Sequence, residues 1–243
     1  MRSGIFAAVF YVASFVLAGG LAYRIRLYAK TPAALRIPTT PAPTTHAGVA
    51  VRLAGEVVLF QSLFKANKWT WAFGWVFHAA MLATLVQHLR YFLQPVPWPV
   101  VLEQPIGVLA GFPMAAGLFA LWGRRFVVER IRYITGPSDH LMLALLVAIT
   151  VSGLAMKYLA HTDIVALKTF FLGLMRLRVE PLPGDPVLLV HLSLVATLMV
   201  VFPFSKLLHA PGVFFSPSRN QPDDTRERRF VSRSALLKPA SKA

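Results

Sequence analysis

Five long apolar runs divide the chain, and polar or proline-containing stretches separate them. They cover residues 5–23, 71–92, 106–122, 140–159 and 187–208. A helix needs about 20 apolar residues to cross the ~30 Å hydrocarbon core of a bilayer, so each run has the length of one membrane span. Backbone groups in lipid must hydrogen-bond within their own segment, and none of the runs alternates like a membrane barrel strand. The pattern therefore predicts an all-α membrane protein with five transmembrane helices.

The stretches between the runs predict where the chain leaves the membrane. Residues 24–70 form the longest one and contain an apolar, basic segment, 51–67. This segment is typical of an amphipathic helix, which either anchors at the inner interface or provides a docking surface. We expect residues 1–215 to form the membrane domain and residues 216–243 a polar cytoplasmic tail. The apolar run 167–177 is too short to span, and we expect it on the outer surface.

Composition and charge agree with this interpretation. The chain is 56% hydrophobic and 14% charged, with a mean hydropathy of +0.59, values typical of a membrane protein. The net charge of +15 would suggest a nucleic acid partner in a soluble protein. Here, however, 19 of the 25 Lys and Arg residues lie in 24–70, 123–139 and 205–243, which are all on one side of the five spans.

The positive-inside rule uses this asymmetry to predict orientation. It places the N-terminus in the periplasm and the C-terminus in the cytoplasm, so the chain is expected to be a multi-pass protein of the cytoplasmic (inner) membrane. The first run is expected to be a retained span, because its charges follow it, whereas those of a cleaved signal peptide precede it. Nucleic acid is not an expected partner.

The chain contains no cysteine. Disulfides, thiolate metal sites, iron–sulfur clusters and covalently attached c-type haem are therefore excluded. If the chain moves electrons, haem has to be held by coordination alone.

Four of the seven histidines lie on two of the predicted spans. His78 and His88 are ten residues apart and His191 and His209 are eighteen apart, which corresponds to about 15 Å and about 27 Å along a helix axis. If the two helices are antiparallel, His78 meets His209 at one depth and His88 meets His191 at the other. A histidine inside a bilayer is costly without a partner, so two pairs at two depths indicate ligands.

Two imidazoles at each depth suit a b-type haem. Haem brings its own four equatorial nitrogens, whereas zinc or copper would lack third and fourth ligands. The spacing therefore predicts a four-histidine di-haem helix bundle with two haem b groups. His78 and His209 would ligate the inner haem iron, and His88 and His191 the outer one. For any single histidine, a hydrogen-bonded core residue is the commoner interpretation.

The other histidines and two nearby cations have less specific signals. We expect interfacial or capping roles for His46, His140 and His161. Arg90 lies two residues from His88, and Lys206 lies three from His209. Both cations suit haem propionates, and both equally suit the role of boundary residues whose charged ends reach the membrane surface.

The span 187–208 carries a recognisable family pattern. The run from Phe202 to His209, with the ten-residue spacing of His78 and His88, resembles the gamma subunit of respiratory nitrate reductase. That family comprises five-helix di-haem b cytochromes that oxidise quinol. Residues 60–69 and 209–217 more narrowly resemble the M subunit (DsrM) of DsrMKJOP, the Dsr sulfur-metabolism membrane complex.

This resemblance implies the histidine pairing given above and an oxidoreductase function. The chain would exchange electrons between the quinone pool, for example menaquinone, and a cytoplasmic iron–sulfur subunit related to heterodisulfide reductase. It would do so within a multi-subunit, sulfite reductase-linked complex. Quinone is apolar and reaches its site from lipid, so we expect it beside the outer haem. Gln87, Tyr91 and Glu103 are the polar candidates at that level, although exposed boundary residues are commoner than quinone ligands.

Two alternatives remain open at this point. The nearest is a gamma subunit of a nitrate reductase or of another quinol-linked oxidoreductase. A different class is a haem-free membrane anchor or a transporter that uses histidines as proton relays. Transporters often show inverted repeats and broken helices, and the sequence shows neither.

Overall fold

A computed structural model of the chain describes residues 1–32, 38 and 41–223. Residues 224–243, most of the expected tail, lie outside the described residues. The described part is helical, and its longer helices are α1 (Arg2–Lys30), α2 (His46–Val58), α4 (Lys68–His88), α5 (Trp98–Val127), α7 (Pro137–Ala155), α8 (Ile164–Met175) and α9 (Pro186–Val201). Its shorter helices are α3 (Gln61–Ala66), α6 (Glu129–Ile134), α10 (His209–Phe215) and α11 (Pro217–Asn220).

The five predicted spans are confirmed. Within the described residues, five helical stretches are long and apolar enough to cross a membrane: Arg2–Lys30, Lys68–Tyr91, Trp98–Val127, Pro137–Ala160 and Pro186–Phe204. Three of them continue past the α-helix named above into a tighter or wider turn: η1 (Leu89–Tyr91) after α4, η2 (Met156–Ala160) after α7 and η3 (Phe202–Phe204) after α9. The turn η2 is π-helical, a form frequent at functional sites.

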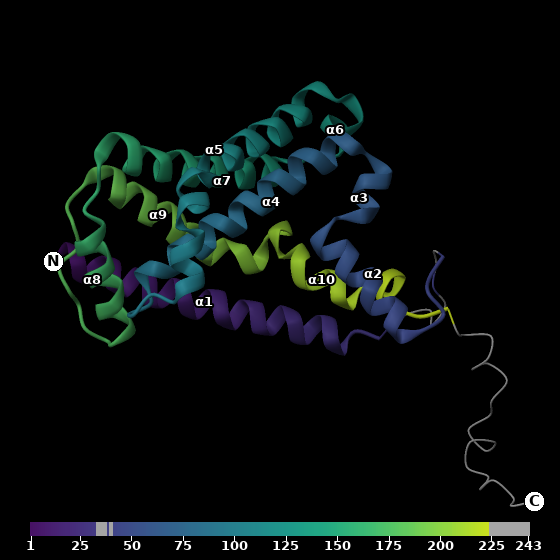
Figure 1. Ribbon diagram of the computed structural model, residues 1–243, viewed down its shortest axis with the longest axis horizontal. Helices are drawn as coiled ribbons and strands as arrows, with labels where there is room; N and C mark the ends of the chain where they lie inside the picture. The colour runs from purple at the N-terminus through teal and green to yellow at the C-terminus, as the bar shows by residue number, and fades with distance from the viewer. Residues whose placement is uncertain (33–37, 39–40, 224–243) are drawn as a thin grey trace, which may run out of the picture. The chain divides into compact units, whose positions relative to one another are not determined.

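The chain forms two compact units. The first comprises residues 1–20 and 63–206, and the second comprises residues 21–62 and 207–243. In the first unit, α4 packs on α5, α5 on α7 and α7 on α9 (Figure 1). A glycine permits the close packing of α5 on α4, because a Cβ atom at Gly117 of α5 would lie 3.0 Å from the carbonyl oxygen of Phe73 on α4.

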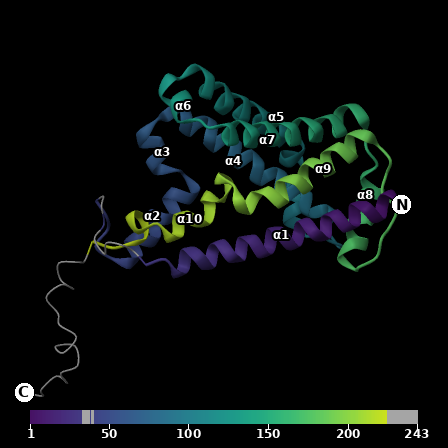
Figure 2. The same ribbon diagram turned by 180° about the vertical axis from the view of Figure 1, so that it is seen from behind.

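Helix α8 closes one end of the first unit. Its apolar residues repeat at helical spacing, and Leu167, Phe170 and Leu174 are buried. The hydroxyl of Tyr11 on α1 donates a hydrogen bond to the carbonyl of Leu174 (2.8 Å). Both views place α8 beside the N-terminal end of α1 (Figure 2). The run predicted to lie on the outer surface is therefore a helix with one face in the core.

The second unit contains the predicted amphipathic segment, which differs from the expected 51–67. Helix α2 begins earlier, at His46, and ends at Val58; a separate short helix, α3, begins at Gln61. Between them Phe60 adopts a left-handed conformation, with a φ of 50°. The break returns the chain so that the amide of Ser62 donates to the carboxylate of Glu56 on α2 (3.2 Å). The sequence did not predict this break, because the residues on both sides of it keep helical periodicity.

The same carboxylate connects α2 to the C-terminal part of the chain. Glu56 accepts a second hydrogen bond from the Ser62 hydroxyl and forms an ion pair with Arg219 of α11. Burial by itself would raise the pKa of Glu56. The hydrogen bonds from Ser62 and the charges of Arg219 and Arg52 outweigh burial, so the pKa of this carboxyl lies below its ordinary value.

We expect Arg219→Met to weaken the attachment of α11 to α2 by about 1–3 kcal/mol, the usual worth of a hydrogen-bonded charge. Hydrogen exchange of the α2 amides at pH 7 should then be faster than in the parent. Because the folded pKa of Glu56 is lowered, its contribution is present above the unfolded pKa and is lost as pH falls through the folded value. The difference between variant and parent should shrink below about pH 4.5. The exposed Arg26 provides the control, Arg26→Met; equal effects of both changes would refute the specific pair.

Candidate cofactor site

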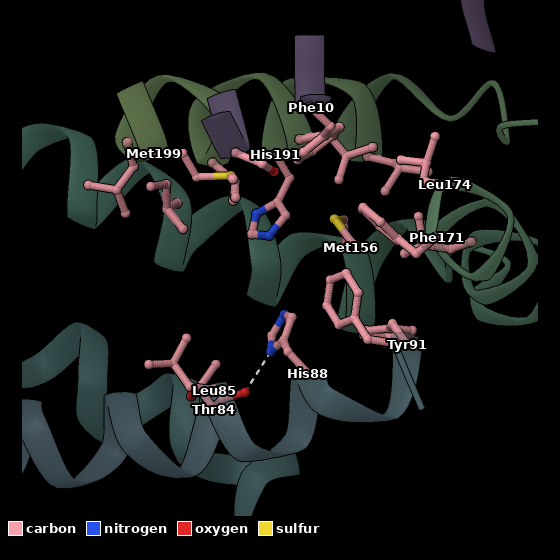
Figure 3. Close-up of a pocket in the computed structure, with 18 of the residues that line it drawn as sticks. Phe10, Thr84, Leu85, His88, Tyr91, Met156, Phe171, Leu174, His191 and Met199 are labelled. Atoms are coloured by element: carbon pink, nitrogen blue, oxygen red, sulfur yellow. Dashed lines mark hydrogen bonds between the residues drawn. The ribbon is translucent and has the colours of Figure 1, made fainter. Parts of the chain in front are cut away.

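Two of the predicted histidines meet at one cavity in the first unit. His88 ends α4, and His191 lies near the start of α9. Their imidazoles point toward one another from opposite sides of the cavity (Figure 3). The cavity has a volume of about 490 Å³. The structure therefore brings together the pair that depth along two antiparallel helices predicted.

The backbone holds His88 in one tautomer. Its Nδ1 lies 2.6 Å from the carbonyl oxygen of Thr84, one helical turn earlier (Figure 3). A carbonyl oxygen only accepts hydrogen bonds, so Nδ1 carries the proton and donates the hydrogen bond. The lone pair is then on Nε2. A hydrogen bond from the second ring nitrogen is the usual way in which a protein orients a metal-binding histidine.

His191 is held in the same tautomer, but by a side chain and not by a backbone carbonyl. Only 8% of this residue is exposed, and its Nδ1 lies 2.9 Å from the hydroxyl oxygen of Ser152 on α7. That hydroxyl donates its single proton to helix carbonyls, those of Ala148 (2.7 Å) and Ile149 (3.0 Å). It therefore accepts from Nδ1 of His191, which leaves the lone pair of His191 on Nε2 as well.

The cavity between the two imidazoles is strongly apolar. Aromatic, methionine and aliphatic side chains from α1, α4, α5, α8 and α9 form its wall, among them Phe10, Met81, Met114, Phe171, Leu188 and Met199. Such a wall offers few hydrogen-bonding partners to water in the space in front of the two lone pairs. It suits a large, flat and mostly hydrocarbon ligand.

A second cavity, of about 500 Å³, adjoins the same two histidines. It shares His88, His191, Tyr91 and Met156 with the first cavity but has a different character. The side chains that line only this cavity include polar and cationic ones: Gln87, Arg90, Gln104, Lys157, His161 and Thr162. No Asp or Glu is among the lining residues in the part of the chain that the structure describes.

The predicted quinone and propionate residues are distributed unevenly around these cavities. Arg90 and Gln87 line the second cavity, and Tyr91 lines both. Glu103 lines neither; its carboxylate lies back over Gly107 on its own helix, α5. Lys206 donates to both carboxylate oxygens of Asp139 (2.9 and 3.0 Å). Arg90 is thus the predicted propionate partner that the structure places at the histidine pair.

The predicted inner pair is divided between the two units. His78 lies on α4, ten residues before His88, and its Nδ1 lies 2.7 Å from the carbonyl of Gly74. By the same argument as for His88, its lone pair is on Nε2. His209 begins α10 in the second unit. The pairing of His78 with His209 stays a prediction from helical spacing.

The remaining histidines have other surroundings. His140 accepts a hydrogen bond from the indole nitrogen of Trp122 (3.0 Å). His161 follows η2 with a left-handed backbone and lines the second cavity. His46 is the first residue of α2, after the N-cap Thr45.

Sequence reasoning missed two contributors to this site. Ser152 orients His191, yet a serine inside an apolar run carries no signal of its own. Lys157 lies near the end of the fourth span, where a lone cation is typical of a residue at the membrane boundary. Its position on η2, two residues beyond the end of α7, could not be recognised from apolar periodicity.

The donor set distinguishes among possible cofactors. Among the described residues, no three or more His, Asp or Glu side chains gather into a metal site. The cavity instead presents two opposed imidazoles, both with a lone pair on Nε2. This donor set fits the two axial positions of a haem, and the apolar wall fits its macrocycle.

Comparison with known proteins confirms the resemblance to the nitrate reductase gamma subunit. Residues 61–219 match the family model described as "Nitrate reductase gamma subunit". A relative in Archaeoglobus fulgidus, named "Hdr-like menaquinol oxidoreductase cytochrome b-like subunit", is 36% identical over 91% of this chain and 80% of its own length. A protein of the same name in Archaeoglobus profundus is 32% identical over 94% of this chain and 82% of its own length.

Proposed function

Because the chain belongs to the nitrate reductase gamma subunit family, we propose that it is a di-haem b cytochrome that exchanges electrons between menaquinone and a cytoplasmic iron–sulfur subunit. In coarser terms it is a quinol-linked membrane cytochrome b that acts as a redox subunit. The observation that carries the proposal is the pair His88 and His191, which face one another across an apolar cavity.

We assign the outer haem to His88 and His191 and the inner haem to His78 and His209. These histidines would hold a haem at each site, and each haem would supply a reversible one-electron couple. Other groups of the chain orient those imidazoles: the carbonyl oxygen of Thr84 and the hydroxyl oxygen of Ser152 each accept a hydrogen bond from an Nδ1–H group and hold the ring in place. Such supporting partners also make the ligating nitrogen more basic. The apolar wall lowers the local dielectric and limits access of water.

Quinone contacts are proposed at the same end of the first unit. Tyr91 and Gln87 line the cavity next to His88, and a phenol and an amide are suited to hydrogen bonds with quinone oxygens. Glu103 stays a weaker candidate because its carboxylate lies against Gly107. A quinol would reach this position from lipid, and its oxidation to quinone would give two electrons to the haem groups and release two protons toward the outer side.

The partner is proposed from the names of the two relatives and from the composition of this chain. Both relatives are named "Hdr-like", and the chain has no cysteine with which to hold a cluster. We propose that the iron–sulfur subunit is related to heterodisulfide reductase and docks on the cytoplasmic side, with the chain oriented N-out and C-in. Sulfur metabolism through a Dsr-type complex is the specific setting that we propose; a nitrate reductase remains the alternative.

A redox difference spectrum tests the proposed function. Membranes that contain the chain should show a b-type band when a menaquinol analogue is added, and membranes that lack it should not. The complex purified from its own organism should contain an iron–sulfur protein related to heterodisulfide reductase. Absence of any haem would favour the anchor or transporter class, and co-purification with a nitrate-reducing catalytic subunit would favour the alternative.

A further inference from the structure

The two cavities that meet at His88 and His191 differ in charge. The first has almost entirely apolar walls, as described above. The second carries two permanent cations, Arg90 and Lys157, and no carboxylate among its described lining residues. Charged side chains inside membrane spans are costly and usually have a partner that compensates them. An excess of positive charge beside an apolar slot therefore indicates an anionic group on the ligand.

Lys157 is held in position by unusual local structure. It lies on the π-helical turn η2, at the end of α7. Its ammonium group donates to the carbonyl oxygen of Val108 on α5 (3.3 Å) and lies 5.4 Å from the centre of the Tyr158 ring. An ammonium group has three N–H donors, so the contact with Val108 fixes the side chain and leaves donors for a further acceptor.

Arg90 lines the same cavity from a different helical segment. It belongs to η1, the turn that follows α4, and its guanidinium carbon lies 5.9 Å from the centre of the Tyr91 ring. Arginine and lysine thus approach one cavity from two helices. A guanidinium group is suited to carboxylate oxygens, and an ammonium group adds a compact second charge.

This asymmetry matches the chemistry of haem b, which carries two propionates on one edge and hydrocarbon substituents on the opposite edge. Resting on the function proposed above, we infer that the second cavity receives the propionate edge of the outer haem, with Lys157 and Arg90 as its positioning residues. The first cavity then takes the apolar edge. Lys157 is the new assignment, and Arg90 is the sequence candidate that the structure retains.

The assignment predicts an effect on redox potential. A cation beside the propionates offsets part of their negative charge, so it favours the reduced iron, which has one positive charge fewer. Removing the charge at Lys157 should lower the midpoint potential of the outer haem. The inner haem should keep its potential.

The test is spectroelectrochemical titration of the purified complex with Lys157→Gln. We expect an unchanged haem content, a lower midpoint potential for the component that His88 and His191 variants abolish, and shifted carboxylate bands in the reduced-minus-oxidised infrared spectrum. Lys157→Arg keeps the charge, so it should retain the potential while it still shifts the carboxylate bands. Lys168→Gln makes the same change at a lysine that lines neither cavity and should alter neither.

The outcomes distinguish this inference from the function on which it rests. If Lys157→Gln leaves both the potential and the carboxylate bands of the outer haem unchanged, Lys157 is not a propionate partner, even though the cytochrome assignment stands. If the glutamine variant does not accumulate, unshifted carboxylate bands in Lys157→Arg lead to the same rejection. If the parent chain contains no b haem, the proposed function itself fails.

Discussion

Replacing either His88 or His191 with alanine is expected to lower the b-haem content from two to one per chain and to remove the same spectral component in both variants. The two imidazoles face one cavity, so the loss of either leaves the iron with one axial ligand in an apolar wall. Electron transfer from a menaquinol analogue should fall by more than about 100-fold, because even a lost supporting partner of a metal ligand costs ~10–100-fold. Pyridine haemochrome analysis and stopped-flow reduction measure the two effects.

The controls use the other histidines. His161→Ala changes a residue that lines the second cavity but is not a proposed ligand, so it should retain both haems. His78→Ala and His209→Ala should each remove the other component, the inner one. If His78 and His88 variants lost one common haem, the ligand pairing would be wrong throughout.

A reporter that is active only in the cytoplasm, fused after Lys242, is expected to be fully active, and one that requires the periplasm should be inactive. The expectation follows from the segments 24–70, 123–139 and 205–243, which hold most of the Lys and Arg residues and therefore belong inside. Fusions truncated after Val179, between the fourth and fifth spans, provide the matched control and should give the opposite pattern. Enzyme activity per unit of fusion protein is the measurement.

If the fusions at both positions show the opposite activities, the chain is oriented in the membrane in the reverse direction. The pair His88 and His191 would then lie on the cytoplasmic side, and the docking side for an iron–sulfur partner would have to be reassigned. The pairing itself would be unaffected, because it depends on depth along the helices and not on their direction in the membrane.

The sequence by itself was sufficient for the spans and for the meeting of His88 with His191. Both depend on quantities that are regular along one helix: an apolar length of about 20 residues and a rise of ~1.5 Å per residue. His88 ends α4 and His191 lies near the start of α9, so antiparallel helices bring the two to a similar depth. Axial spacing does not determine the helix face on which each histidine lies, and in the structure both imidazoles face one cavity.

Breaks in regular helical structure could not be predicted from the sequence. The predicted segment 51–67 is interrupted at Phe60, which has a left-handed backbone conformation. This break lets the Ser62 amide donate a hydrogen bond to the Glu56 carboxylate. The π-helical turn that carries Lys157 interrupts the end of the fourth span in a similar way. In both places the apolar pattern continues through the break, so periodicity alone cannot reveal it.

Contacts between segments remote in the chain were decided only by the tertiary structure. The Ser152 hydroxyl accepts a hydrogen bond from His191, which is 39 residues later in the chain. The carboxylate of Asp139 accepts one from Lys206, which is 67 residues later. Nearness to His209 in sequence left a propionate role and a boundary role equally open for Lys206, whereas Lys157, which is 34 residues before His191 in sequence, lines the cavity at the histidine pair. The sequence thus determined where along its helix each histidine lies, because that position is a local property of a helix. Only the packing of the helices decided which polar side chains surround His88 and His191, because that depends on all the helices at once.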